Sequence, residues 1–247
     1  MLPSLPRWIA HRGGGSLAPE NTLAGIRLAA RLGLRAVEFD VMLSADGTPV
    51  LIHDETLERT TNGRGRVAET ADAVLFALDA GDGEPVPTFR AAASLCRELG
   101  LLANVEIKPA GGYERATAEA VAQVALAVWQ GSARLPLLSS FSPEALAVAR
   151  ERAPQLPRGL LYDQVPADWH AAFVELDACT LHCAAGQVDG QLLAAAAAHR
   201  VPLLCFTVNC PEQAKMLFAG GVAALFTDRL DLAVAETAAY NRLQPSA

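Results

Sequence analysis

Short hydrophobic runs alternate with alanine-rich stretches along the whole chain, and this alternation predicts strands separated by helices. The runs with the length and composition of strands are 8–10, 36–41, 103–107, 137–140, 159–162, 178–182, 202–207 and 224–227. Helices are expected between them, among others at 22–32, 118–129 and 212–218. A chain of 247 residues with this pattern suits an α/β fold of the (β/α)₈ type, a closed TIM barrel.

One further extended run, 49–53, does not fit the alternation. Asp46 and Gly47 precede it, and Asp-Gly between extended segments is typical of a two-residue hairpin turn. The run is therefore predicted to return antiparallel to the second strand. With these two residues as the turn, Asp40 would face His53 at about 5 Å between Cβ atoms.

The stretch 54–100 separates this hairpin from the third barrel strand. It holds a polar turn at 59–65 and a glycine-rich loop at 81–85, and a helix is expected at 90–99. It is too short and too interrupted for a second domain. We expect a single domain over 1–247, with 54–100 as an insertion that caps one end of the barrel.

Composition narrows the range of partners. Hydrophobic residues make up 51% of the chain, enough for a large core, and the net charge of -7 argues against nucleic acid or anionic lipid as a general partner. Five cysteines without a C-x-x-C pair are typical of reduced thiols. No signal-peptide pattern or membrane-span pattern is visible, so a cytoplasmic location is expected. His170 and His199 are expected to be structural.

Two carboxylates close the second predicted strand. Glu38 and Asp40 flank Phe39, and the alternation of a strand places both acids on one face and Phe39 on the other. Buried acids are costly unless they share a proton, pair with a cation or bind a metal. An isolated pair of this kind is more often structural than catalytic. Whether these two acids are catalytic therefore depends on the residues at the neighbouring strand ends.

Polar residues also close two other predicted strands. His11 and Arg12, with a glycine run behind them, follow the first strand, and Glu106 and Lys108 share one face at the end of the third. The carboxyl ends of barrel strands carry catalytic residues, so this convergence favours an active site over chance ion pairs. Glu106 and the two acids of the second strand form an all-oxygen set suited to Mg²⁺ or Ca²⁺ rather than zinc.

Short motifs follow one another along nearly the whole chain. They are His11-Arg12-Gly13, Pro19-Glu20-Asn21-Thr22, Glu38-Phe39-Asp40-Val41, Asp46-Gly47, His53-Asp54, Leu57-Glu58-Arg59-Thr60-Thr61-Asn62-Gly63, Pro87-Thr88, Glu106-Ile107-Lys108, Ser139-Ser140-Phe141, Thr207-Val208-Asn209 and Thr227-Asp228. In this order the motifs resemble the successive signatures of the glycerophosphodiester phosphodiesterase family. Each motif is weak alone, but the combination is highly specific.

The resemblance implies a barrel fold and a metal-dependent hydrolysis of glycerophosphodiesters to sn-glycerol 3-phosphate and an alcohol. It implies acid/base catalysis by His11 and His53. The metal ligands that it implies are Glu38, Asp40 and Glu106. Phosphate contacts would come from Arg12 and Lys108, and Phe206 would form an apolar wall against the glycerol. Asn21 and His182 fall at matching strand or loop ends without an assigned role.

In such a site one histidine would take the proton of the attacking hydroxyl and the other would protonate the leaving alcohol, which suits imidazole at neutral pH. The sequence does not choose between water and the neighbouring glycerol hydroxyl as nucleophile. It also leaves open the head-group alcohol, the native metal and whether copies of the chain assemble.

Two alternative functions each require a feature of their own. A lipase-like enzyme would need an exposed apolar rim, and a phosphate-binding barrel without activity would need a lost catalytic position. The sequence shows neither feature.

Overall fold

The computed structural model describes residues 5–235 and contains the predicted closed barrel of eight parallel strands. The barrel strands are β1 (Trp8–Ala10), β2 (Ala36–Leu43), β4 (Leu102–Ile107), β5 (Leu137–Ser140), β6 (Arg158–Tyr162), β7 (Thr180–Ala184), β8 (Leu203–Phe206) and β9 (Ala224–Thr227). The barrel closes because β1 pairs with both β2 and β9. The predicted fold class is therefore confirmed.

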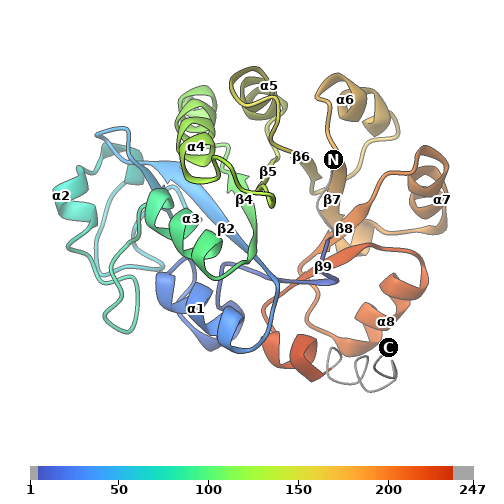
Figure 1. Cartoon of the computed structure of the whole chain (residues 1–247), viewed down its shortest axis with the longest axis horizontal. Coiled ribbons are helices and arrows are strands. Elements are labelled where there is room, and N and C mark those ends of the chain that lie inside the picture. Colours follow the sequence, from blue (N-terminus) through green and yellow to red (C-terminus); the bar gives the residue numbers. More distant parts are fainter. Residues whose placement is uncertain (1–4, 236–247) are drawn as a thin grey trace.

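Helices form a ring outside the strands, as Figure 1 shows. They are α1 (Leu23–Arg31), α3 (Phe89–Glu98), α4 (Glu114–Val128), α5 (Pro143–Arg152), α6 (Trp169–Glu175), α7 (Gly190–His199) and α8 (Pro211–Ala219). Side-chain caps start several of them. The hydroxyls of Thr22, Thr88 and Ser142 accept hydrogen bonds from backbone N–H groups in the first turns of α1, α3 and α5. These caps satisfy donors that a helix leaves unpaired, and so fix where each helix begins.

Every residue of β2 is buried, because one face of the strand lines the barrel and the other packs under the helices. Phe39 points outward, where its ring lies 6.1 Å from that of Phe89 on α3. Strand alternation then turns Glu38 and Asp40 into the barrel. The outward apolar contact thus fixes the face on which the two acids lie.

The hairpin after β2 has a three-residue loop in place of the predicted two-residue turn. The Ser44 amide donates to the Thr48 carbonyl at 3.0 Å, which leaves 45–47 as the loop. Gly47 has a φ of 79°, the left-handed conformation that closes a type I turn with a bulge. The predicted turn is wrong because an Asp-Gly pair suits this loop as well as the shorter one.

The longer loop shifts the pairing of β3 (Pro49–Leu51) by one residue. Val41 faces Leu51, and the Ile52 amide donates to the Asp40 carbonyl at 3.2 Å, so Ile52 and not His53 lies opposite Asp40. His53 is the next residue along the chain. It still lines the same pocket as Asp40, although the predicted pairing is wrong.

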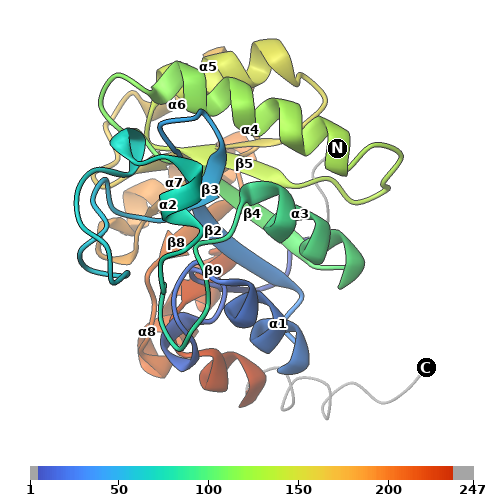
Figure 2. The ribbon, with the colours of Figure 1, turned by 90° about the vertical axis from the view of Figure 1, so that its left-hand side faces the viewer.

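Between β3 and α3 the chain leaves the barrel and forms η2 (Val67–Glu69) and α2 (Asp72–Leu75), which lie beside β3 in Figure 2. This segment has a small hydrophobic core of its own, which includes Leu57, Leu75 and Val86. By contrast, α3 contacts α1 and α4 within the helix ring. The stretch predicted as one insertion, 54–100, therefore consists of an outer segment and a barrel helix.

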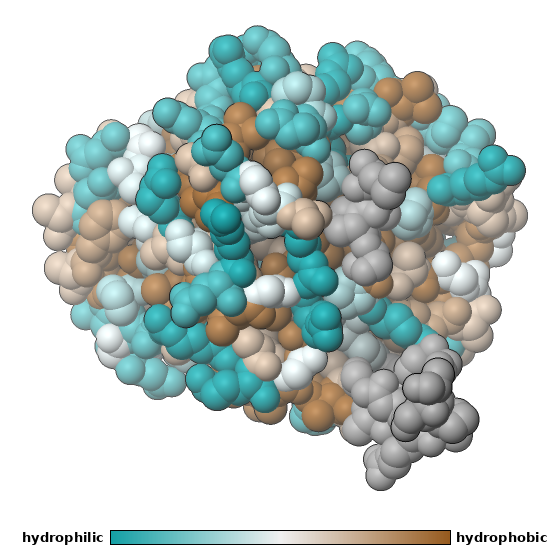
Figure 3. Space-filling view, in the orientation of Figure 1, coloured by the Kyte–Doolittle hydropathy of each residue, from teal (hydrophilic) through white to brown (hydrophobic). Residues whose placement is uncertain are grey.

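Within residues 5–235, no helix is long and apolar enough to cross a membrane. On the face shown in Figure 3, hydrophilic side chains dominate, and the hydrophobic ones form small separate groups.

Candidate active site

A cavity of about 450 Å³ lies at the carboxyl ends of the barrel strands. Every residue to which the sequence assigned a role lines it, namely His11, Arg12, Glu38, Asp40, His53, Glu106, Lys108 and Phe206. They come from five strand ends that are far apart in the sequence. The barrel therefore brings all of them together in one place.

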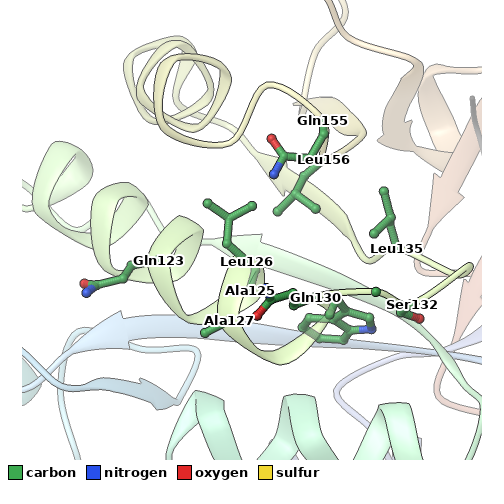
Figure 4. A pocket seen from close by; sticks show the side chains of 11 residues that line it. Gln123, Ala125, Leu126, Ala127, Gln130, Ser132, Leu135, Gln155 and Leu156 are labelled. Carbon is green, nitrogen blue, oxygen red and sulfur yellow. The ribbon is translucent and has the colours of Figure 1, made fainter.

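A larger cavity, of about 600 Å³, lies between the end of α4, the start of β5 and the segment after α5 (Figure 4). Its lining includes Leu126, Leu135 and Leu156, with glutamines such as Gln123 and Gln155 at its edge. No ionisable side chain lines it. Of these two cavities, only the smaller one contains groups that could carry out acid/base or metal chemistry.

Glu38, Asp40 and Glu106 form a buried cluster in which one ligand oxygen from each lies within 4.8 Å of the others. Burial and the charge of Asp40 raise the pKa of Glu38 to about 8 and that of Glu106 to about 7. Burial also opposes ionisation of Asp40, but Lys108 and other cationic neighbours hold its pKa below the usual range. Near neutral pH the three acids therefore cannot all ionise cheaply without a cation.

The same cluster contains a buried oxygen with no partner. Oε1 of Glu38 makes no hydrogen bond to any described residue, whereas Oε2 accepts one from the Arg12 amide at 2.9 Å. Burying an unpaired carboxylate oxygen is costly. An orphaned oxygen within an all-oxygen set fits a hard divalent cation such as Mg²⁺ or Ca²⁺.

Two cationic side chains border the cluster. Lys108 places Nζ 2.8 Å from Oε1 of Glu106 and 3.4 Å from Oδ1 of Asp40. Arg12 places Nε 3.7 Å from Oδ2 of Asp40, and its Nη1 donates to Glu20 at 2.9 Å. Arg12 has a φ of 50°, a left-handed backbone that is uncommon outside glycine. These cations can stabilise further negative charge in the cavity.

Each of the two histidines is held at Nδ1 by a carboxylate. His11 Nδ1 lies 2.7 Å from Oδ1 of Asp228, and His53 Nδ1 lies 2.6 Å from Oδ1 of Asp54. A carboxylate at one ring nitrogen orients the imidazole and leaves Nε2 for proton transfer. Both imidazoles thus have the geometry that acid/base catalysis requires.

The two imidazoles differ in their affinity for protons. Burial disfavours protonation of His11, but its hydrogen bond to Asp228 and the charge of Glu38 outweigh burial and raise its pKa. Burial lowers the pKa of His53, and Lys108 adds to this effect against the attraction of Asp40. His11 therefore binds a proton more readily than His53.

Sequence reasoning assigned no role to three residues that orient the site. Asp228 and Asp54 contact the histidines, and Asn21 makes two hydrogen bonds to Asp40. The Asn21 side chain donates to Oδ2 of Asp40 at 2.9 Å and accepts from the Asp40 amide at 3.0 Å. Asp54 directly follows His53 in the sequence, and this adjacency could have been used to predict the contact between their side chains. No local signal pairs His11 with Asp228, because 217 residues separate them.

The far half of the cavity is mostly apolar and aromatic. Its lining residues include Phe141, Leu161, His182, Phe206 and Phe226. The rings of Phe141 and Phe206 meet edge to face at 5.7 Å. Asp163 is the only acidic residue that lines this half. Its side chain makes no hydrogen bond or ion pair with another described residue.

His182 lies in this half and is completely buried. Burial lowers its pKa to about 3, so the ring is neutral, and Nε2 lies 2.8 Å from Oγ1 of Thr180. It packs over Gly159, where an added Cβ would lie 2.7 Å from Nε2. His182 is therefore a packed, neutral part of the pocket wall.

Comparison with known proteins agrees with this geometry. A model of the glycerophosphoryl diester phosphodiesterase family matches residues 11–232. A glycerophosphodiester phosphodiesterase of Caldanaerobacter subterraneus is 33% identical over 232 residues, which cover 89% of this chain and 93% of the relative.

Solved structures resemble the chain as well. One is an Oleispira antarctica phosphodiesterase in complex with the product sn-glycerol-3-phosphate, with a TM-score of 0.90 and 36% identity over 95% of this chain and 97% of that one. Another is a glycerophosphodiester phosphodiesterase from Agrobacterium tumefaciens, with a TM-score of 0.79 and 27% identity over 94% of this chain and 100% of that one.

Proposed function

Since the chain belongs to the glycerophosphoryl diester phosphodiesterase family and is a phosphodiesterase of glycerophosphodiesters, we propose that its catalysis depends on a divalent cation and two histidines. The products would be sn-glycerol 3-phosphate and an alcohol. The observation that carries this proposal is the buried cluster of Glu38, Asp40 and Glu106, within which one oxygen has no partner.

Those three carboxylates would hold Mg²⁺ or Ca²⁺. Such an ion, when bound, supplies positive charge that polarises the phosphoryl group. A phosphodiester gains negative charge on the oxygens around phosphorus as the reaction proceeds. Arg12 and Lys108 border the same cluster and would bind these oxygens, so they would stabilise the transition state from two sides.

The raised pKa of His11 and the lowered pKa of His53 favour opposite roles for them. We assign the general acid to His11, which would protonate the leaving alcohol, and the general base to His53, which would take the proton of the attacking hydroxyl. Asp228 and Asp54 would keep each ring oriented. The attacking hydroxyl is that of water or of the neighbouring glycerol carbon, and either one loses its proton to the same base.

The substrate we propose is a small deacylated phosphodiester. Phe206 would form an apolar wall against the glycerol carbons, together with Phe141, which meets it edge to face. The negative net charge disfavours an anionic lipid surface. The cysteines form no disulfide within residues 5–235, which supports the cytoplasm as the location of the enzyme.

The test is a panel of glycerophosphodiesters assayed for glycerol 3-phosphate, with EDTA treatment and metal add-back. We expect turnover that EDTA removes and that Mg²⁺ or Ca²⁺ restores. Intact phospholipid vesicles and phosphate monoesters should be poor substrates. Cleavage of vesicles as fast as of soluble diesters would overturn the proposed substrate, and full activity after verified metal removal would overturn the proposed mechanism.

A further inference from the structure

Arg59 lies in the outer segment, and the proposed mechanism gives it no role. Its guanidinium makes four hydrogen bonds to two carboxylates. Nε and Nη2 donate to Asp54 at 2.5 and 2.9 Å, and Nη1 and Nη2 donate to Glu20 at 2.7 and 2.8 Å. A bidentate contact on each of two edges uses the planar fork fully, which a lysine could not reproduce.

Each of the two carboxylates also holds a residue that lines the active-site cavity. Asp54 contacts Nδ1 of His53 at 2.6 Å, and Glu20 accepts from Nη1 of Arg12 at 2.9 Å. Arg59 is therefore the centre of a chain of charged groups whose two ends are the proposed base and a proposed phosphate ligand. It joins the end of β3 to the loop between β1 and α1.

The electrostatics agree with this arrangement. Hydrogen bonds from Arg59, with a further contribution from His53, hold the pKa of Asp54 well below its usual range. Burial opposes ionisation of Glu20, but Arg59 and Arg12 outweigh burial and lower its pKa. Both carboxylates are thus ionised and converge on one guanidinium. Without Arg59, two like charges would face each other beside the site.

We propose that Arg59 is a positioning residue for the phosphodiesterase reaction, orienting His53 through Asp54 and Arg12 through Glu20. The inference rests on the proposed function, because it assigns those two residues to catalysis. Arg59 itself does not line the active-site cavity. It acts by limiting the movement of groups that must lie within a fraction of an ångström of their working positions.

The chain provides a closely matched control. Arg66 lies in the same outer segment, its side chain is 46% exposed like that of Arg59, and it forms an ion pair with Glu55 at 2.6 Å. Neither Arg66 nor Glu55 lines the active-site cavity. Arg66→Ala should therefore remove an equally exposed arginine and its ion pair without disturbing the site.

We expect Arg59→Ala to lower kcat roughly 10- to 100-fold, as loss of a second layer of support around a site commonly does. Arg66→Ala should stay within about twofold of the parent. The Tm of both variants is measured as well, so that a loss of kcat in a folded protein is distinguished from a loss of the fold. Arg59→Lys keeps the charge but not the fork, and it should recover only a small part of the lost activity. Full activity in folded Arg59→Ala would overturn the proposal.

A combined variant tests whether Arg59 acts through its two carboxylates. In an Asp54→Asn, Glu20→Gln background, Arg59→Ala should lower kcat by no more than about threefold further, because the groups through which it acts are already altered. If its effect remains undiminished there and falls on KM, Arg59 binds the substrate directly and the positioning role is wrong. Guanidinium ion added to Arg59→Gly should restore part of kcat, but should not restore His53→Ala.

A spectroscopic measurement separates this inference from the function on which it rests. The Nδ1–H proton of His53, assigned by its loss in Asp54→Asn, should shift or broaden in Arg59→Ala and remain unchanged in Arg66→Ala. This signal does not depend on turnover. A parent enzyme that cleaves no glycerophosphodiester would overturn the proposed function, whereas an unchanged His53 signal in Arg59→Ala would overturn the positioning role.

Discussion

The two halves of the active-site cavity differ in chemistry although both are built from the same kind of strand. The half on β1, β2 and β4 carries the three acids, Arg12, Lys108 and His11 within a few ångströms of one another. The half on β5 to β9 presents aromatic rings, an aliphatic side chain, one neutral histidine and a single exposed carboxylate, that of Asp163. Under the proposed function, the charged half would bind the phosphate and the other half would contact the carbon chain of the glycerol.

This difference indicates how the barrel can bury several charged groups. Charged groups on adjacent strands can compensate one another's burial, because each ion pair offsets part of the desolvation cost. The same groups spread evenly around the barrel would each be buried alone. Concentration in one half therefore permits a buried charged site, and it leaves the other half mostly apolar.

The largest effect should come from loss of the cation that we propose the three acids hold. Metal removal should lower activity by at least about 1,000-fold, because a bound cation contributes several kcal/mol to stabilising transition-state charge. Glu106→Gln should have a similar effect through weaker metal binding, measured by elemental analysis and by assay. Full activity in a metal-free Glu106→Gln variant would show that the cluster is structural.

The histidines should come next, with losses of roughly 100- to 10,000-fold on substrates with alkyl leaving groups. His11→Ala should spare much of the rate on an analogue that releases p-nitrophenol, since this alcohol leaves without protonation. His53→Ala should slow both substrates. Equal losses on both substrates in both variants would contradict the division of roles and indicate that the rings position phosphate or metal.

The same division predicts a bell-shaped dependence of activity on pH. The base must be unprotonated, so activity should rise with pH through the pKa of His53, which is lowered. The acid must be protonated, so activity should fall as pH rises through the pKa of His11, which is raised. A pH profile of kcat/KM measures both limbs. A profile without an alkaline limb in the imidazole range would contradict the role of His11.

A smaller effect is expected in the apolar half. Phe206→Ala should raise KM roughly 10-fold and change kcat less than about threefold, because the ring contacts a part of the substrate that does not react. Phe76→Ala serves as the control, since Phe76 is exposed and lies outside the cavity. A loss confined to kcat would mean that Phe206 acts on the reacting groups.

The smallest effect should be that of Asp163→Asn. Its carboxylate is exposed and unpaired, so its removal should change kcat/KM by less than about threefold on substrates with neutral head groups. A loss of 10-fold or more on all substrates, measured alongside Asp168→Asn, would show that charge chemistry is not confined to the other half.

The eight-stranded barrel and its charged half could be predicted from the sequence because their signals are local. Strand alternation places Glu38 and Asp40 on one face, and the shared ends of parallel strands bring Glu106 to them. The apolar half could not be predicted in the same way. Phe141, Leu161 and Phe226 are ordinary hydrophobic residues, and only barrel closure turns them toward the same cavity.

The hairpin register shows a second limit of sequence reasoning. The loop type depends on whether Ala45 joins Asp46 and Gly47, and the sequence alone fits both loop lengths. The link between Arg59 and Glu20 shows the same limit, because 39 residues separate them and no periodic pattern relates the two. Contacts between loops follow from the closed barrel rather than from local spacing.

The contact between Gly159 and His182 bears on how this protein can evolve. Because a methyl group at position 159 would overlap the imidazole, neither alanine nor any larger residue can be accepted there while His182 keeps its place. The order of substitutions matters. A smaller side chain at 182 removes only part of the overlap, because Oγ1 of Thr180 would lie 2.8 Å from the same added Cβ. Position 159 can therefore vary only after both neighbours have become smaller, whereas the reverse order passes through a damaged intermediate.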